Sequence, residues 1–214
     1  MRTPLTDTPP RFRSTALRLL ALGLLLAALG CAKSTANADM AAQDAPPGPA
    51  RTFSIAFPDD FTVTTAPKTL CAHSYFPVPA EGMVLGGYYS GDAYAGTNFG
   101  SASVVVSVRP PDALGEDCTD LDGSTACGPK AGVRSAVVNG IAFRYAEMND
   151  AAVGHRLQAR QYWTLHDGRR YEVLLAVSYT DIGMYTPGAV KGFDADACMA
   201  RLLDILHTFT FTTP

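Results

Sequence analysis

The sequence predicts an α+β fold in which an antiparallel β-sheet is flanked by helices. Short segments of alternating apolar and polar residues run from residue 52 onward, and several of them end in a turn signal. Two of these turns, at Asn139-Gly140 and at His166-Asp167-Gly168, are typical of β-hairpins. Only one segment, near the C-terminus, has the apolar spacing of an amphipathic helix. Hairpins followed by a late helix indicate an α+β rather than an α/β domain.

The first strands are predicted by alternation and by one apolar block. Residues 52–57 alternate and stop at Pro58-Asp59-Asp60, which is typical of a turn, and residues 61–65 resume the alternation. Residues 101–108 contain three consecutive valines. A β-branched block of this kind suits a strand that is covered on both faces.

Two hairpins are predicted further along the chain. The first joins residues 137–138 to 141–145 through Asn139-Gly140. The second joins residues 156–165 to 170–179 through His166-Asp167-Gly168. Asn-Gly and Asp-Gly favour the two-residue turns that match the twist of paired strands.

The predicted helix begins near Asp194 or Asp196, either of which could cap its first turn, and ends at about His207. Its apolar residues share one face, which we expect to lie on the sheet: Cys198, Leu202, Ile205 and Leu206. Residues 208–212 then alternate as a final strand.

Residues 82–100 combine six glycines with large aromatic side chains. Tyrosine next to glycine and serine is the composition of adaptable binding loops, so Tyr88, Tyr89 and Tyr94 are candidate binding residues. The alternative is an irregular loop whose aromatic side chains fold back over the sheet edge.

The N-terminal segment, residues 1–30, is predicted to be a signal peptide. Four arginines precede an apolar run over residues 19–30, which is shorter than the roughly 20 residues of a membrane-spanning helix. The run ends in Leu29-Gly30-Cys31, which resembles the lipobox of bacterial lipoproteins. The resemblance implies that Cys31 is lipidated, and Ala32 after it implies an outer-membrane destination. The alternative is cleavage after Ala38, which would release a soluble periplasmic or secreted protein.

The mature chain is predicted to begin with a disordered tether, residues 31–50, followed by a single domain over residues 51–214. The tether segment is rich in Ala, Ser, Asn, Asp, Gln and Pro and has no apolar periodicity. Such a segment buries too little apolar surface to offset its conformational entropy.

The remaining cysteines, Cys71, Cys118, Cys127 and Cys198, predict two disulfides, because their number is even and the chain carries an export signal. Four cysteines allow three pairings. Cys118 and Cys127 bracket a short loop, so their bond is the easiest to close and leaves Cys71 to pair with Cys198. A metal site of four thiolates is the alternative, but the two close C-x-x-C pairs typical of such zinc sites are absent from the sequence.

Charge argues against nucleic-acid binding. The chain has 17 Lys and Arg against 20 Asp and Glu, a formal net charge of −3, and it has no basic run. Removing a signal peptide that contains four arginines and one aspartate makes the mature chain more negative. Such a domain lacks the electrostatic footprint that phosphates require.

Sequence motifs give no support for catalysis. The chain contains no G-x-S-x-G, H-E-x-x-H, P-loop or dinucleotide-binding pattern, and its four histidines (His73, His155, His166 and His207) are scattered. We therefore expect no enzyme activity and no cofactor. The alternative is an envelope hydrolase whose site residues are dispersed along the sequence.

An acidic loop around Cys118 is the nearest approach to a metal site. Asp117, Asp120 and Asp122 lie in it, so calcium-dependent binding is a further alternative. The EF-hand register fails, because its first and twelfth positions would be Cys118 and Pro129. We expect a solvated acidic loop and no metal.

The domain resembles the PsbP-like group in three respects. These are the strand at residues 53–57 followed by Pro58, the two late hairpins, and the ending at residues 202–209. The resemblance implies an antiparallel sheet with flanking helices, one of them after the second strand, and a role as an extrinsic subunit or assembly factor. The expected function is thus a lipid-anchored, non-enzymatic module that binds a protein or envelope component or supports assembly.

Overall fold

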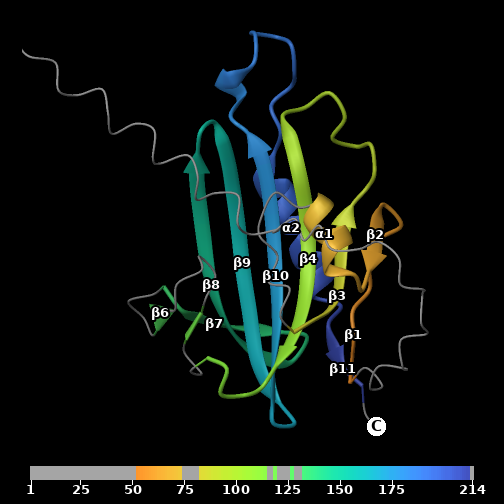
Figure 1. The fold of residues 1–214 in the computed structure, drawn as a ribbon, viewed down its shortest axis with the longest axis vertical. Helices are drawn as coiled ribbons and strands as arrows, with labels where there is room; N and C mark the ends of the chain where they lie inside the picture. Colours follow the sequence, from red (N-terminus) through yellow and green to blue (C-terminus); the bar gives the residue numbers. More distant parts are fainter. Residues whose placement is uncertain (1–51, 74–81, 115–117, 120–125, 128–131, 213–214) are drawn as a thin grey trace, which may run out of the picture. The chain divides into compact units, whose positions relative to one another are not determined.

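The computed structural model describes residues 52–73, 82–114, 118–119, 126–127 and 132–212. The predicted signal peptide, lipidated Cys31 and tether lie outside these residues. In the described part, the main feature is a seven-stranded sheet in the order β2-β3-β4-β10-β9-β8-β7, in which all neighbouring strands are antiparallel (Figure 1). Its strands are β2 (Phe61–Thr64), β3 (Met83–Tyr89), β4 (Phe99–Arg109), β7 (Arg134–Val138), β8 (Ile141–Ala152), β9 (His155–His166) and β10 (Arg169–Thr180).

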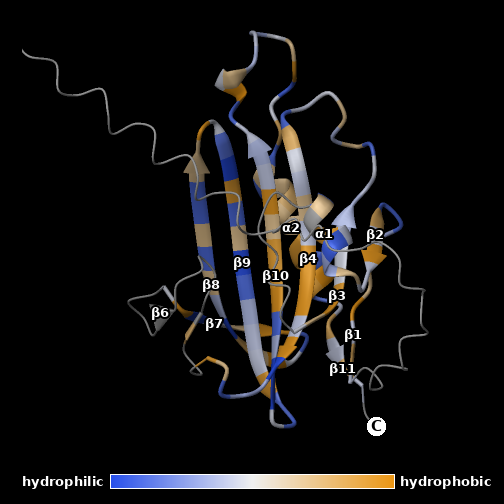
Figure 2. Cartoon of the chain, in the orientation of Figure 1, coloured by the Kyte–Doolittle hydropathy of each residue, from blue (hydrophilic) through white to orange (hydrophobic). Residues whose placement is uncertain are grey.

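The two central strands, β4 and β10, are covered on both faces, as the valine block predicts. Val173, Leu175 and Val177 of β10 belong to one buried cluster, whereas Leu174 and Ala176 belong to another on the opposite face. This division follows from the two-residue period of a strand. Figure 2 shows apolar residues concentrated in β4 and β10, with more hydrophilic residues in β8 and β9.

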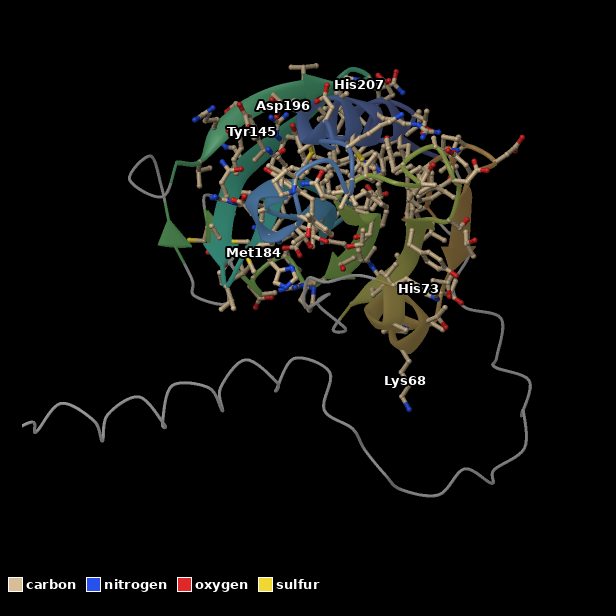
Figure 3. All side chains as sticks on the ribbon, turned by 90° about the horizontal axis from the view of Figure 1, so that it is seen from above. Lys68, His73, Tyr145, Met184, Asp196 and His207 are labelled. Atoms are coloured by element: carbon tan, nitrogen blue, oxygen red, sulfur yellow. The ribbon has the colours of Figure 1, made fainter. Side chains whose placement is uncertain are left out.

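One helix packs on each face of the sheet. Helix α2 (Ala195–Leu206) places Cys198, Leu202 and Ile205 in the larger cluster, and Asp194 caps it by accepting a hydrogen bond from the Ala197 N–H at 2.9 Å. The prediction for this helix is confirmed. Helix α1 (Pro67–His73) follows β2, where the family resemblance implies a helix, and its Leu70 belongs to the cluster on the other face. In Figure 3, α2 and the α1 helix that carries Lys68 and His73 lie on opposite sides.

Both predicted hairpins are confirmed. Asn139-Gly140 joins β7 to β8 and Asp167-Gly168 joins β9 to β10, with positive φ at both residues of each turn. A third turn of the same kind, Val153-Gly154, joins β8 to β9, and the sequence did not predict it because valine is not a turn residue.

The segment 82–100 is an irregular loop only over residues 90–98, where Tyr94 packs back against the core cluster, so the alternative given for the segment is correct in part. Its first part is β3, an interior strand between β2 and β4. Two positions of this strand have no room for a side chain. A Cβ at Gly86 would lie 2.7 Å from the Leu70 side chain, and a Cβ at Gly87 would lie 2.2 Å from the Phe57 ring. The two glycines allow groups on both faces to approach the backbone closely.

The remaining strands are short ladders. β1 (Phe53–Ser54) pairs with β11 (Thr210–Phe211), so the predicted first and last strands exist but are shorter than expected. The rings of Phe53 and Phe209 stack at 5.4 Å and join this ladder to the larger cluster. β5 (Cys118–Thr119) pairs with β6 (Ala126–Cys127).

The described part is therefore mostly antiparallel sheet with few helices. Among its helices, none is both long and apolar enough to cross a membrane.

Candidate functional site

The candidate site is a pocket of roughly 400 Å³ at the end of the sheet where β3 and β10 finish and β4 and β9 begin. A pocket of this volume lies within the range of small-ligand sites. Its described lining residues come from α1 and four strands: Ala72, His73, Tyr89, Gly100, Ser101, His155, Ser178, Tyr179 and Thr180.

Hydroxyl groups form one side of this pocket. Ser101 of β4 and Ser178 of β10 are register partners, and their Oγ atoms lie 2.8 Å apart. Gly100 precedes them, and a Cβ there would lie 3.0 Å from the carbonyl oxygen of Ser178. Glycine at this position therefore keeps the backbone of β4 close to β10.

Two imidazoles border the pocket. His73, at the end of α1, stacks on the Tyr88 ring with centroids 4.2 Å apart and an interplanar angle of 4°. His155 begins β9 and pairs in register with Thr180 at the end of β10. The stacking fixes the orientation of His73, and the strand register fixes the backbone of His155.

The chemistry of the pocket is polar without fixed charge. None of the described lining residues is Asp, Glu, Lys or Arg. Hydroxyl and imidazole groups both donate and accept hydrogen bonds, and Tyr89 and Tyr179 add aromatic carbon. This combination suits a ligand that carries several hydroxyl or amide groups and little charge.

The three tyrosines predicted to bind a partner do not form one surface. Tyr89 lines the pocket, while its ring packs against Phe61, Tyr94 and Phe99 at 4.8–5.7 Å. Tyr88 points to the opposite face of β3 and stacks on His73. Of the three tyrosines, Tyr89 is a described lining residue of the pocket, and Tyr88 contacts the lining residue His73.

Tyr94 belongs instead to an aromatic cluster next to α2. Its ring lies 5.0 Å from Phe193, and burial raises the pKa of its hydroxyl, with a smaller contribution from Cys198. Arg201 of α2 lies under the same cluster, where its Nη2 donates to both carboxylate oxygens of Asp60, at 2.6 and 2.5 Å. Asp60 raises the pKa of Arg201 above its ordinary value. Tyr94 is therefore a partly buried side chain that packs against the core.

The predicted Cys71–Cys198 disulfide is wrong. Cys198 is a buried free thiol. It lies on α2, whereas Cys71 is in α1 on the other side of the sheet, and a disulfide requires Cα atoms within about 7 Å. The even cysteine count did not reveal that the sheet separates the two helices.

Cys118 and Cys127 are register partners across β5 and β6, the arrangement that their predicted disulfide requires. The bond itself stays a prediction. The candidate calcium ligands Asp117, Asp120 and Asp122 lie outside the described residues. Within the described ranges, no group of three or more His, Cys, Asp or Glu side chains could hold a metal ion.

A buried charge cluster lies on the same face as α1, and the sequence did not predict it. Glu172 accepts a hydrogen bond from Arg170 Nε at 2.6 Å, and its other carboxylate oxygen lies 3.2 Å from Arg109 Nε. Arg170 also lies over the Trp163 ring at 4.9 Å and donates to the Cys118 carbonyl at 2.7 Å. The cluster therefore attaches β5 to the sheet. Its only signal in the sequence was a charged pair two residues apart in an apolar strand.

Comparison with known proteins gives no family assignment. The sequence matches no protein-family model and no curated protein. Among solved structures, the chain is similar to LpqN of Mycobacterium tuberculosis, described as involved in cell envelope biogenesis, with 13% identity, a TM-score of 0.40, and coverage of 75% of this chain and 83% of that one. It is also similar to a protein from Bacteroides thetaiotaomicron, with 12% identity, a TM-score of 0.41, and coverage of 76% of this chain but only 46% of the other. Neither similarity is strong enough to establish a shared fold or function.

Proposed function

We propose that this chain is a lipid-anchored envelope protein whose PsbP-like domain is a non-enzymatic binding module. The pocket between α1 and the ends of β4 and β10 binds a saccharide of the cell envelope. Cys31 carries the lipid, residues 31–50 form the tether, and the domain faces the periplasm from the outer membrane.

The composition of the pocket lining is the observation that carries this proposal. Ser101, Ser178 and Thr180 place hydroxyl groups beside two imidazoles, and the described lining includes no charged carboxylate, ammonium or guanidinium group. Saccharides present many hydroxyl groups and apolar ring faces. Neutral hydrogen-bonding groups and tyrosine rings complement both of these features.

The location of the perturbed titratable groups favours binding over hydrolysis. Catalytic acids and bases usually have shifted pKa values and lie in the pocket where they act. In the described residues, the raised pKa values of Tyr94, Tyr162 and Cys198 all arise mainly from burial. The pKa values of Arg134, Arg156, Asp181 and Arg201 are also shifted, in each case by a side-chain hydrogen bond as the largest cause. None of these seven groups is among the described lining residues, although Arg156 and Asp181 directly follow the lining residues His155 and Thr180.

The test measures retention of envelope saccharides, both peptidoglycan fragments and lipopolysaccharide core oligosaccharides, by the purified protein. Ala72 is exposed on α1 and lines the pocket, so Ala72→Trp should block it and reduce retention at least tenfold. Thr69→Trp is the control, because Thr69 is exposed on the same helix and is not among the lining residues. The class of saccharide that the protein retains shows whether the ligand comes from peptidoglycan or from lipopolysaccharide. Absence of retention, or equal loss in both variants, would contradict the proposal.

A further inference from the structure

Three exposed apolar side chains gather at the turn between β8 and β9. Val153 is 92% exposed, Met184 64% and Ile182 48%, the last two in the short 3₁₀ helix η2 (Ile182–Met184). Met184 packs directly on the turn, because a Cβ at Gly154 would lie 2.7 Å from its Cγ and 2.8 Å from its Sδ. We call Val153, Ile182 and Met184 the apolar tip.

Val153 has a backbone conformation that is unfavourable for valine. The three two-residue turns of the sheet have nearly the same backbone, with φ of 48°, 49° and 47° at the first residue, but that residue is Asn139, Val153 and Asp167 respectively. Asparagine and aspartate tolerate the left-handed conformation, whereas a β-branched residue there is strained. Since the Val153 side chain is almost fully exposed, packing within the domain does not offset this strain.

The apolar tip is held in one arrangement by polar contacts. The backbone N–H of Asp181 donates to the Gly154 carbonyl at 2.6 Å, which joins η2 to the turn. The Asp181 carboxylate accepts from Arg156 Nη2 at 2.6 Å and from the Gly183 N–H at 3.0 Å. A rigid apolar surface loses little conformational entropy when it docks.

The tip lies at the end of the sheet opposite to where the chain enters the domain. β1 pairs with β11, and Phe211 of β11 stacks at 3.7 Å on His166, the last residue of β9. Val153 lies just beyond the other end of β9, so 12 residues of strand, or about 36–40 Å, separate the two ends (Figure 1). The tip is therefore at the end of the domain farther from Phe53 of β1, where the described chain begins.

The charges around the tip disfavour a lipid surface. Peripheral membrane contacts usually add Lys, Arg or Trp to their apolar groups. Here Arg156, a cation close to the tip, is paired with Asp181, and Asp150 near the turn is an exposed carboxylate.

We infer that the apolar tip docks into an apolar pocket of a partner protein whose rim carries a basic group facing Asp150. The tip and the saccharide pocket lie at the same end of the sheet, because His155 lines the pocket two residues after Val153. A single partner could therefore reach both.

The test uses a photo-crosslinking residue, p-benzoylphenylalanine, placed in the full-length protein in cells at Ile182, or at Val137 as the control. Val137 is 73% exposed on β7, at the other end of the sheet. The expected result is a discrete protein adduct from position 182 and none from position 137. Adding Val153→Asn should reduce the adduct at least tenfold while raising the melting temperature, because asparagine relieves the strain. Adding Asp150→Lys should also reduce the yield of the adduct from position 182. Crosslinking in 1 M NaCl should retain most of this adduct.

A lipid adduct, an adduct with a second copy of this chain, or no adduct would overturn the inference. So would a protein adduct that Val153→Asn leaves unchanged. Membrane fractionation of the Cys31→Ser variant reports on the anchor separately. A failure of the proposed anchor is thus distinguishable from a failure of tip docking.

Discussion

At the scale of single residues, the least expected feature is a carboxylate shared by two guanidinium groups inside the protein. Glu172 is 3% exposed and Arg170 is fully buried, while Arg109 is 11% exposed. Buried ions remain stable only when their partners are present, because each ion has lost its hydration. The Glu172 carboxylate is a buried counter-ion that both cations share.

We therefore expect Glu172→Ala to lower the free energy of unfolding by about 3–5 kcal/mol, because Arg170 and Arg109 both lose a buried carboxylate that pairs with them. Arg170→Met should cost less, since Arg109 still pairs with Glu172 and methionine fills the space over Trp163. Urea unfolding of both variants measures which of them loses more free energy of unfolding. Equal costs, or a larger cost for Arg170→Met, would contradict this view of the cluster.

Burial raises the pKa of the Cys198 thiol, while its contact with Tyr94 opposes this shift. A raised pKa in the folded state stabilises the protein at pH values below the unfolded pKa of the thiol, about 8.5, and this contribution is lost as the pH rises above it. Cys198→Ala should therefore lose less stability than wild type between pH 7 and pH 10. Thermal unfolding of both proteins across this pH range measures the difference.

A thiol reagent should modify Cys198 only after denaturation. Rapid modification of Cys198 in the native protein would contradict its burial.

At the scale of elements, local signals predicted some strands and missed others for a physical reason. Asn139-Gly140 and Asp167-Gly168 specify their turns by themselves, so both hairpins were predictable. In β3, glycine content indicated a loop, whereas Gly86 and Gly87 are required by the approach of Leu70 and Phe57. That requirement exists only after α1 and the β1–β2 segment have packed, so composition alone could not reveal it.

Gly87→Ala should accordingly destabilise the domain by about 1–3 kcal/mol, because its Cβ would overlap the Phe57 ring. Gly192→Ala is the matched control, since nothing lies within 4 Å of its Cβ position. Chemical denaturation compares the two variants. If Gly87→Ala were as harmless as Gly192→Ala, the close packing across β3 would be disproved.

At the scale of the whole molecule, the pocket is assembled from five elements: α1, β3, β4, β9 and β10. Of the residues that line the pocket, the sequence singled out Tyr89 as a binding candidate. It also singled out Tyr88, whose ring stacks on that of the lining residue His73. It gave no reason to bring His73 and His155 together, because they are 82 positions apart and on different elements. The strand order of the sheet creates this proximity, and no local pattern encodes it.

The lipid anchor on Cys31 is also a prediction about the whole molecule. We expect mass spectrometry of the mature protein to find an acylated N-terminal Cys31, and Cys31→Ser to release the protein from membranes. An unmodified N-terminus at Asp39 would instead establish cleavage after Ala38 and a protein without a lipid anchor.

The most direct test of the account is a titration of the isotope-labelled protein with the retained envelope saccharide, followed by NMR of the backbone amides. We predict that the largest shifts occur at Gly100, Ser101, His155, Ser178 and Thr180, which line the pocket, and that Ala72→Trp abolishes them. Shifts confined to the α2 face of the sheet, or shifts that persist in Ala72→Trp, would contradict the claim that this pocket is the binding site.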